Sequence, residues 1–218
     1  MKNLTTKYHL FESSNEDKLY RKLLKAIESN DIKTVKEISP KVDLNKKEGG
    51  HWSEIPLFIA VYYDKYDIIK ILLENGADVN IKTSLNKNAL IFSSNYNIIK
   101  LLLEHNIEIN INRNKSHNFI PLLYHINISN YKTVKLLLKN DADVNIRDNN
   151  NKNALFYVKS EEMFDLLMRY GIKCEINNKN EIFLDKLLDV NLKEYIKENY
   201  PDFYKQCLKL KKLKQFNI

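Results

Sequence analysis

Apolar and polar positions along the chain repeat with a period of about 33 residues, which is typical of repeat proteins. Four segments share one pattern of paired apolar clusters: residues 55–81, 88–111, 120–146 and 153–176. The positions that open these segments are almost evenly spaced and are Pro56, Ala89, Pro121 and Ala154. In such proteins each unit buries its apolar side against the next unit.

The second half of each segment predicts a helix packed between neighbours. Residues 68–73 and 134–138 carry apolar side chains on more than one face, as a helix that is buried on two sides requires. Each predicted helix is followed by a residue type that tolerates the left-handed conformation closing a helix. These residues are Gly76, Asn106, Asp141 and Gly171. The pattern therefore predicts four helix pairs with equivalent ends.

The segments resemble ankyrin repeats, whose pattern runs T-P-L-H-x-A-A, then V-K-L-L-L, then G-A-D-V-N. The matching stretches are 56–57 and 121–122 for the first motif, 69–73 and 134–138 for the second, and 76–80 and 141–145 for the third. A degenerate first unit precedes them, in which Ala26 corresponds to Ala60 of the next unit. The resemblance implies an all-α fold, an ankyrin-repeat solenoid of stacked helix-turn-helix units with projecting β-turns.

We expect three parts: an N-terminal segment over 1–17, an ankyrin repeat domain over 18–178, and a helical C-terminal cap with a Lys-rich tail over 179–218. The five expected repeats span 18–50, 51–82, 83–112, 113–147 and 148–178. The Thr and His positions of the family's first motif hold other residues here: Ile55 and Phe58, Asn88 and Ile91, Ile120 and Leu123, Asn153 and Phe156. We expect apolar packing to replace the hydrogen bonds of those Thr and His side chains.

Composition disfavours most cofactor enzymes. The chain has only four glycines and no glycine-rich phosphate-binding motif, while its many asparagines indicate no particular chemistry. The histidines and cysteines show no metal-ligand spacing, and we expect no cofactor, metal site or catalytic set. Cys174 and Cys207 are interpreted as small buried apolar residues in a reducing compartment. The resemblance implies a non-catalytic protein–protein interaction module.

The positive charge is concentrated at the C-terminus. The net charge is +7, and the stretch 201–218 holds five lysines against one aspartate. We interpret this stretch as a capping helix, since the end of a solenoid needs one polar side. The alternative is an anionic partner, nucleic acid or acidic protein, bound by Lys209, Lys211 and Lys212. A nucleic acid is disfavoured because the excess of basic residues forms no long stripe.

No stretch of the sequence predicts a membrane span or a leader. The longest uncharged apolar run, over 55–63, is too short to cross a bilayer, and the stretch 1–22 lacks an apolar core. We expect a soluble cytoplasmic protein that is monomeric apart from its partner. Delivery into a host cytoplasm by a leaderless route is the alternative. Two roles fit this sequence. The partner is a host protein in the first, and in the second it is a cognate protein that this chain masks.

The repeats alternate in length. The opening positions 56, 89, 121 and 154 are followed by second helices centred on Ile69, Ile99, Val134 and Phe164. This interval is shorter by three positions in every second repeat, which is nearly one helical turn, so either the first helix or its connection to the second helix is shortened there. We predict a stepped concave wall, in which Tyr62, Tyr63, Asn127 and Ile128 project beside a recess near Ser93, Ser94 and Asn95. The alternative is length drift in a tolerant linker.

Aromatic side chains supply the remaining candidates for partner binding. Tyr62 and Tyr63 occupy variable positions of the inner helix, and Trp52 lies in a loop with Gly49 and Gly50. Exposed Tyr and Trp are enriched among interface anchors, although Trp52 has ordinary packing as its alternative. His125 occupies the small-residue position of Ala60 and is placed on the concave face, with a buried structural role as its alternative.

Overall fold

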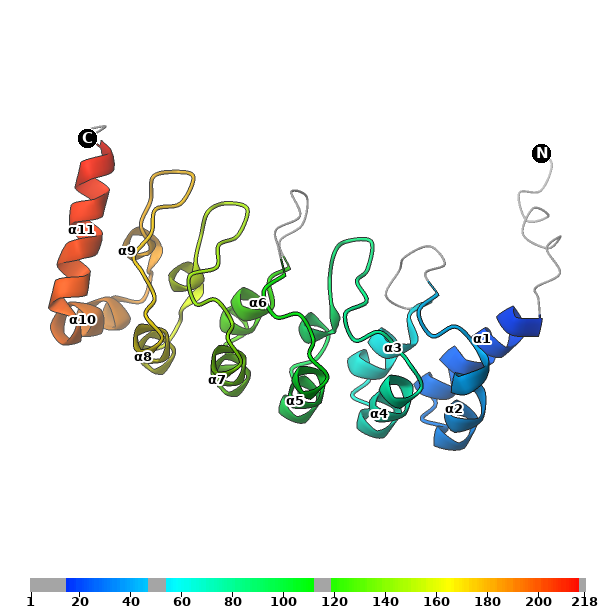
Figure 1. Cartoon of the computed structure of the whole chain (residues 1–218). Coiled ribbons are helices and arrows are strands. Elements are labelled where there is room, and N and C mark those ends of the chain that lie inside the picture. Colours follow the sequence, from blue (N-terminus) through cyan, green and yellow to red (C-terminus); the bar gives the residue numbers. More distant parts are fainter. Residues whose placement is uncertain (1–14, 47–53, 112–118, 216–218) are drawn as a thin grey trace, which may run out of the picture. The chain divides into compact units, whose positions relative to one another are not determined.

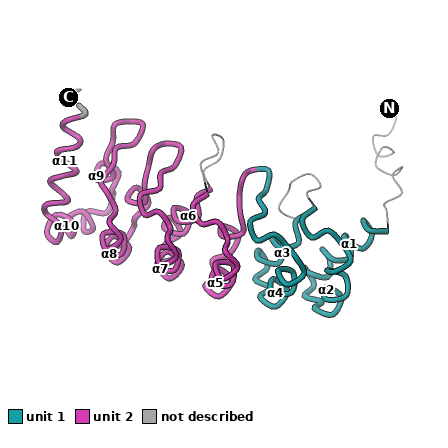
Figure 2. Tube along the Cα trace, in the orientation of Figure 1, with its two compact units in different colours: residues 1–84 teal, residues 85–218 magenta. Residues whose placement is uncertain are grey.

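The computed structural model describes residues 15–46, 54–111 and 119–215. The chain divides into two compact units, residues 1–84 and residues 85–218 (Figure 2). Both are built from short helices joined by tight turns (Figure 1). In the described residues the one backbone bridge outside the helices joins Ile176 to Ile182.

The first unit contains two helix pairs. Its elements are α1 (Asn15–Glu28), α2 (Ile32–Ile38), the 3-10 turn η2 (Ser39–Lys41), α3 (Pro56–Tyr62) and α4 (Tyr66–Glu74). α1 packs against α2 and α3, and α4 packs against α3 and α2. Phe58 and Ile68 are fully buried, as the predicted apolar pattern requires. The unit is thus held by side-chain burial within and between its helix pairs.

The second unit contains three further helix pairs and a C-terminal helical region. Its paired elements are η4 (Ala89–Ile91) with α5 (Tyr96–Glu104), α6 (Pro121–Asn127) with α7 (Tyr131–Lys139), and η5 (Ala154–Tyr157) with α8 (Glu161–Arg169). α9 (Phe183–Lys186), α10 (Val190–Asn199) and α11 (Pro201–Gln215) follow. The four predicted opening positions are each the first residue of an inner helix. The fold is therefore the all-α repeat that the sequence predicts.

The four predicted helix ends adopt the left-handed conformation. The φ angles are 90°, 60°, 64° and 77° at Gly76, Asn106, Asp141 and Gly171. In each case the next residue donates its N–H to a carbonyl five residues earlier, at 2.9 to 3.2 Å. The prediction is confirmed at all four positions, and Asp or Asn replaces glycine at two of them.

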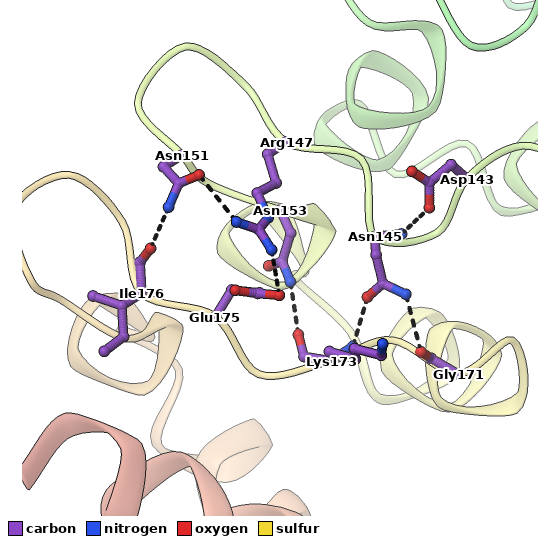
Figure 3. Close-up of polar contacts among 9 residues, drawn as sticks. All are labelled: Asp143, Asn145, Arg147, Asn151, Asn153, Gly171, Lys173, Glu175 and Ile176. Atoms are coloured by element: carbon purple, nitrogen blue, oxygen red, sulfur yellow. Dashed lines mark hydrogen bonds and ion pairs between the residues drawn. The ribbon is translucent and has the colours of Figure 1, made fainter. Parts of the chain in front are cut away.

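Asparagine side chains connect consecutive turns. Asn145 Nδ2 donates to the Gly171 carbonyl oxygen at 3.2 Å, and Asn145 Oδ1 accepts from the Lys173 N–H at 2.8 Å (Figure 3). Asn110 makes the same two contacts with the following turn, as Asn45 does in the first unit. The asparagines thus have a defined chemistry here, which is to satisfy turn backbone groups from the neighbouring repeat.

The C-terminal helices pack on the last repeat, where the sequence predicts a cap. The hydroxyls of Tyr195 and Tyr200 both donate to the Asp165 carboxylate on α8, at 2.9 Å. Hydrogen bonding to this carboxylate raises the pKa of Tyr195 to about 12. These helices are therefore attached to α8 by a polar cluster as well as by ring packing.

The cysteines differ from the sequence-based expectation. Cys174 and Cys207 form a disulfide, with their Cα atoms 5.5 Å apart. Cys207 is fully buried on α11, but Cys174 is half-exposed in the segment after α8. The interpretation of both residues as unpaired buried thiols is wrong, because the fold brings α11 back onto that segment.

In the parts of the chain that the structure describes, no helix combines the length and apolar character needed to cross a membrane.

Candidate functional site

After the 14-residue α1, the inner helices from α3 to η5 alternate between long and short. α3 and α6 have 7 residues each, whereas η4 has 3 and η5 has 4. The lengths of these four inner helices confirm the prediction of alternating long and short repeats. A single 3-10 turn replaces a two-turn α-helix, so the chain reaches the outer helix sooner. Every second inner helix therefore ends early.

A buried asparagine caps each short inner helix. Asn88 Oδ1 accepts from the Leu90 N–H at 3.2 Å, and Asn153 Oδ1 accepts from the Leu155 N–H at 3.3 Å. Each Nδ2 donates to a backbone carbonyl of the following turn at 2.7 Å. Both side chains are fully buried. The expectation of apolar packing is wrong at these two positions, because a short turn leaves N–H groups that need an acceptor.

His125 is buried and is not part of an accessible concave face. Its Nε2 lies 2.8 Å from the carbonyl oxygen of Leu90 in η4, so Nε2–H is the donor. Its Nδ1 is buried without a hydrogen-bond partner among the described residues. Burial lowers the pKa of His125, although the Leu90 bond acts in the opposite direction. The proposed partner contact is therefore wrong, and the side chain satisfies a carbonyl that the short turn leaves open.

In the first unit, two tyrosines at the end of α3 are exposed to solvent. Tyr62 and Tyr63 retain 52% and 45% of their accessible surface. Their ring centroids lie 5.2 Å apart with the planes nearly perpendicular. An edge-to-face pair of this kind offers apolar area with little side-chain entropy to lose. The positions are suited to partner contact, and that role stays a prediction.

In the second unit, the predicted step residues lie along consecutive inter-helix loops. The Ser94 carbonyl oxygen accepts from Asn130 Nδ2 at 3.0 Å. Asn95 Oδ1 caps α5 by accepting from the Asn97 N–H at 3.0 Å, so this side chain is already engaged. Ile128 is 43% exposed. The Asn130 bond thus joins the two loops, and Ile128 is their large exposed apolar side chain.

A hollow of about 310 Å³ lies over η5, the second short inner helix. Its floor is mainly apolar and consists of Leu155, Phe156, Val158, Phe183 and Leu187. The wall on one side is the end of α6. The other wall is the segment that joins α9 to α10. The predicted recess concerned the first short repeat, whereas this hollow belongs to the second.

The rim of the hollow carries charge and a strongly exposed leucine. Lys159 Nζ donates to the carbonyl and side-chain oxygens of Asn127, at 2.5 and 3.3 Å. Among the described residues no carboxylate forms an ion pair with Lys159, while Lys186 pairs with Glu181 at 2.8 Å. Leu188 is 94% exposed beside them. The rim thus combines a cation with an uncovered apolar side chain.

A further rim residue, Asp189, is engaged within the fold. Its carboxylate accepts from the Leu192 N–H at 3.1 Å and caps α10.

Sequence reasoning missed this hollow, although the short interval from Ala154 to Phe164 marks its short helix. The walls could not be predicted, because the segment after α9 matches no repeat motif.

Other candidates divide into three groups. Trp52 lies outside the described residues. Lys211 Nζ forms an ion pair with Asp185 at 2.6 Å, so it serves the packing of α11, while Lys209 and Lys212 are exposed. In the described ranges, no cluster of three or more His, Cys, Asp or Glu side chains is arranged to hold a metal ion.

One buried carboxylate organises the turn that leads into η5. Asp148 accepts from the Tyr157 hydroxyl at 2.5 Å and from the N–H groups of Asn150 and Lys152 at 2.8 Å. Burial, reinforced by this carboxylate, raises the pKa of Tyr157. The arrangement fixes the turn, and its donors and acceptors are paired with one another.

Comparisons with known proteins place these features in a family. A family model of three ankyrin repeats matches residues 23–115, and a model of a single ankyrin repeat matches residues 121–149. Together they cover more than half of the chain. A protein of Rickettsia bellii (strain RML369-C), described as an ankyrin repeat protein, is 37% identical over 71 residues, or 31% of this chain. The match covers 10% of that relative's length.

Proposed function

Because the chain belongs to the ankyrin repeat family, whose members are generally protein–protein interaction modules, we propose that it is a non-catalytic binder of another protein. The contact surfaces are the exposed ends of the inner helices and the turns beside them. Tyr62 and Tyr63 serve in the first unit, and the hollow over η5 serves in the second. The observation that carries the proposal is the apolar hollow with the 94% exposed Leu188 on its rim.

The lining of the hollow defines the chemistry of the partner. The apolar floor accepts a large aliphatic or aromatic side chain, and Leu188 covers that side chain once it is bound. Lys159 holds an ammonium group without a paired carboxylate in the described residues, so an acidic residue beside the apolar one is favoured. Asp189 caps α10 and forms no ion pair with Lys159 in the described structure. The partner therefore presents a bulky apolar residue next to a carboxylate.

The proposal is tested by measuring partner affinity in surface variants. A protein captured by the full chain from native-cell or candidate-host extracts is purified, and its dissociation constant is measured by calorimetry. Leu188→Ser is expected to weaken binding tenfold or more, which is about 1.4 kcal/mol. The double change Tyr62→Ala with Tyr63→Ala is expected to do the same. Leu213→Ser, which alters an exposed leucine on α11, is the matched control and leaves the constant unchanged.

Two outcomes would overturn the proposal. Equal affinity of the Leu188 and tyrosine variants with wild type excludes the two proposed surfaces. Salt-sensitive binding that is lost on Lys209→Ala with Lys212→Ala, and kept on Leu188→Ser, favours an anionic partner of α11 instead. The extract that yields the partner distinguishes a host target from a cognate protein of the same cell.

A further inference from the structure

Helix α11 is attached to the last repeat by very little apolar burial. It spans 15 residues, and among its described side chains the only fully buried one is Cys207. Leu208 and Leu213 remain 39% and 41% exposed. Its apolar face carries Phe203, Cys207 and Leu210, of which only Cys207 is fully buried, so the face is short for a docked helix. Its anchoring therefore depends on a small number of discrete contacts.

Three such contacts hold α11 in the described structure. Phe203 packs edge-on against Phe164, with ring centroids 5.9 Å apart, and lies 6.3 Å from Phe183. Lys211 pairs with Asp185 at 2.6 Å, in a partly exposed ion pair of the kind that contributes little. The disulfide between Cys174 and Cys207 is the covalent contact and lies between the other two.

We propose that this disulfide is a redox-sensitive latch for α11. When it is closed, α11 lies on the last repeat. When it is reduced, α11 separates, while α10 stays attached through the tyrosine hydroxyls that donate to Asp165. Thiols are kept reduced in the cytosol and oxidised outside it, so the latch responds to the compartment in which the protein is found.

The difference in burial between the two cysteine residues sets the order of the exchange reaction. Cys174 is half-exposed and Cys207 is fully buried. A dithiol reductant therefore attacks the Cys174 sulfur as a thiolate, and Cys207 leaves as a thiolate that takes up a proton. The second thiol of the reductant then displaces Cys174 and forms a cyclic disulfide. The protein disulfide gains two electrons and two protons, and the reductant loses the same.

Phe183 connects the latch to the hollow. Its ring lies on the floor of the hollow and also beside Phe203 of α11. Separation of α11 removes Phe203 from this ring cluster and frees Phe183 to move. Reduction is thus expected to change the affinity for the partner, a consequence that rests on the proposed function. The latch itself stands on the disulfide and the sparse burial of α11.

The test compares the oxidised and dithiothreitol-reduced full chain. Without reductant, alkylation with N-ethylmaleimide under denaturing conditions is expected to add no label, and after reduction it adds two. Hydrogen exchange over 201–215 is expected to speed up at least tenfold on reduction, with α8 unchanged. Cys174→Ala with Cys207→Ala is the control, in which dithiothreitol has no effect.

Labelling of both thiols without reductant, or equal exchange of α11 in both states, would overturn the latch. The wild-type comparison needs no substitution, so a variant that folds poorly does not affect it. Affinity for the partner is measured separately. An unchanged affinity with faster exchange of α11 rejects the link to the hollow and leaves the latch standing.

Discussion

The inner helices α6 and η5 begin in different ways. The seven-residue α6 begins with Pro121 after the buried Ile120 and has no side-chain cap. The four-residue η5 begins after Asn153, which is equally buried but caps the turn with its side chain. One position in the repeat therefore holds an apolar residue when the helix is long and an amide when it is short.

This difference shows how three residues are removed from a repeat without loss of the fold. A shortened helix leaves backbone groups unpaired, and polar side chains must reach them from within the core. Asn88 and Asn153 satisfy the N–H groups and connect to the following turn. His125 satisfies a carbonyl of η4 from the next repeat along the chain. The hollow over η5 lies at the second of these shortened helices.

Removing an asparagine cap is expected to have the largest effect. Asn153→Ala deletes a buried side chain that makes two hydrogen bonds, and it leaves two backbone groups without a partner. We expect the free energy of unfolding to fall by about 2–4 kcal/mol, measured by urea denaturation. Asn199→Ala, which removes one exposed bond to the Tyr195 carbonyl oxygen, is the matched control and costs less than about 0.5 kcal/mol. Equal losses in the two variants would contradict the capping role.

His125 is expected to make stability depend on pH. Its folded-state pKa lies below the ordinary value of 6.5, so the unfolded chain binds the proton first. The free energy of unfolding therefore falls as the pH drops through 6.5, and this loss ends once the pH is below the folded-state pKa. The slope from this group is at most about 1.4 kcal/mol per pH unit.

The His125→Ala variant isolates that dependence. It is expected to be less stable than wild type at pH 8, by about 1–3 kcal/mol, because a hydrogen bond and packed volume are lost. The difference between the two proteins should narrow as the pH falls to 5. Urea denaturation across this range provides the measurement, and a constant difference would show that His125 does not titrate as described.

Changes on the rim of the hollow are expected to leave stability almost untouched. Leu188 is 94% exposed, so Leu188→Ser shifts the melting temperature by no more than about 1–2 °C. Val158 is buried in the floor, and Val158→Ser serves as the contrasting variant, with a loss of about 1–3 kcal/mol. Calorimetry of the two variants separates the effect of the exposed rim from that of the buried floor. Similar destabilisation by both would place Leu188 within the packed structure.

The repeat architecture was readable from the sequence because it depends on local patterns. The opening positions and the left-handed residues can each be predicted from nearby residues in the chain. Asp141 adopts the left-handed conformation just as Gly76 does. The alternating lengths followed from counting between equivalent positions. Local geometry of this kind repeats in every unit, so the same pattern occurs several times along the chain.

Features that depend on a particular neighbour could not be read in this way. His125 looks like a substitution at a small-residue position, and its burial makes sense only beside the shortened η4. Cys174 and Cys207 are 33 residues apart, and their pairing depends on α11 folding back onto the last repeat. The hollow also needs the non-repeat segment after α9. In each case the missing information was the tertiary placement of a second element.

We expect the short length of η5 to be required for the hollow that we propose as the partner contact. The most direct measurement is the dissociation constant of the captured partner for a variant with three residues inserted after Tyr157, which gives η5 the length of α6. A cooperative thermal transition near that of wild type confirms that the variant folds. Binding is expected to be at least tenfold weaker, because the added turn would fill the hollow. An unchanged dissociation constant in the folded variant would contradict this expectation.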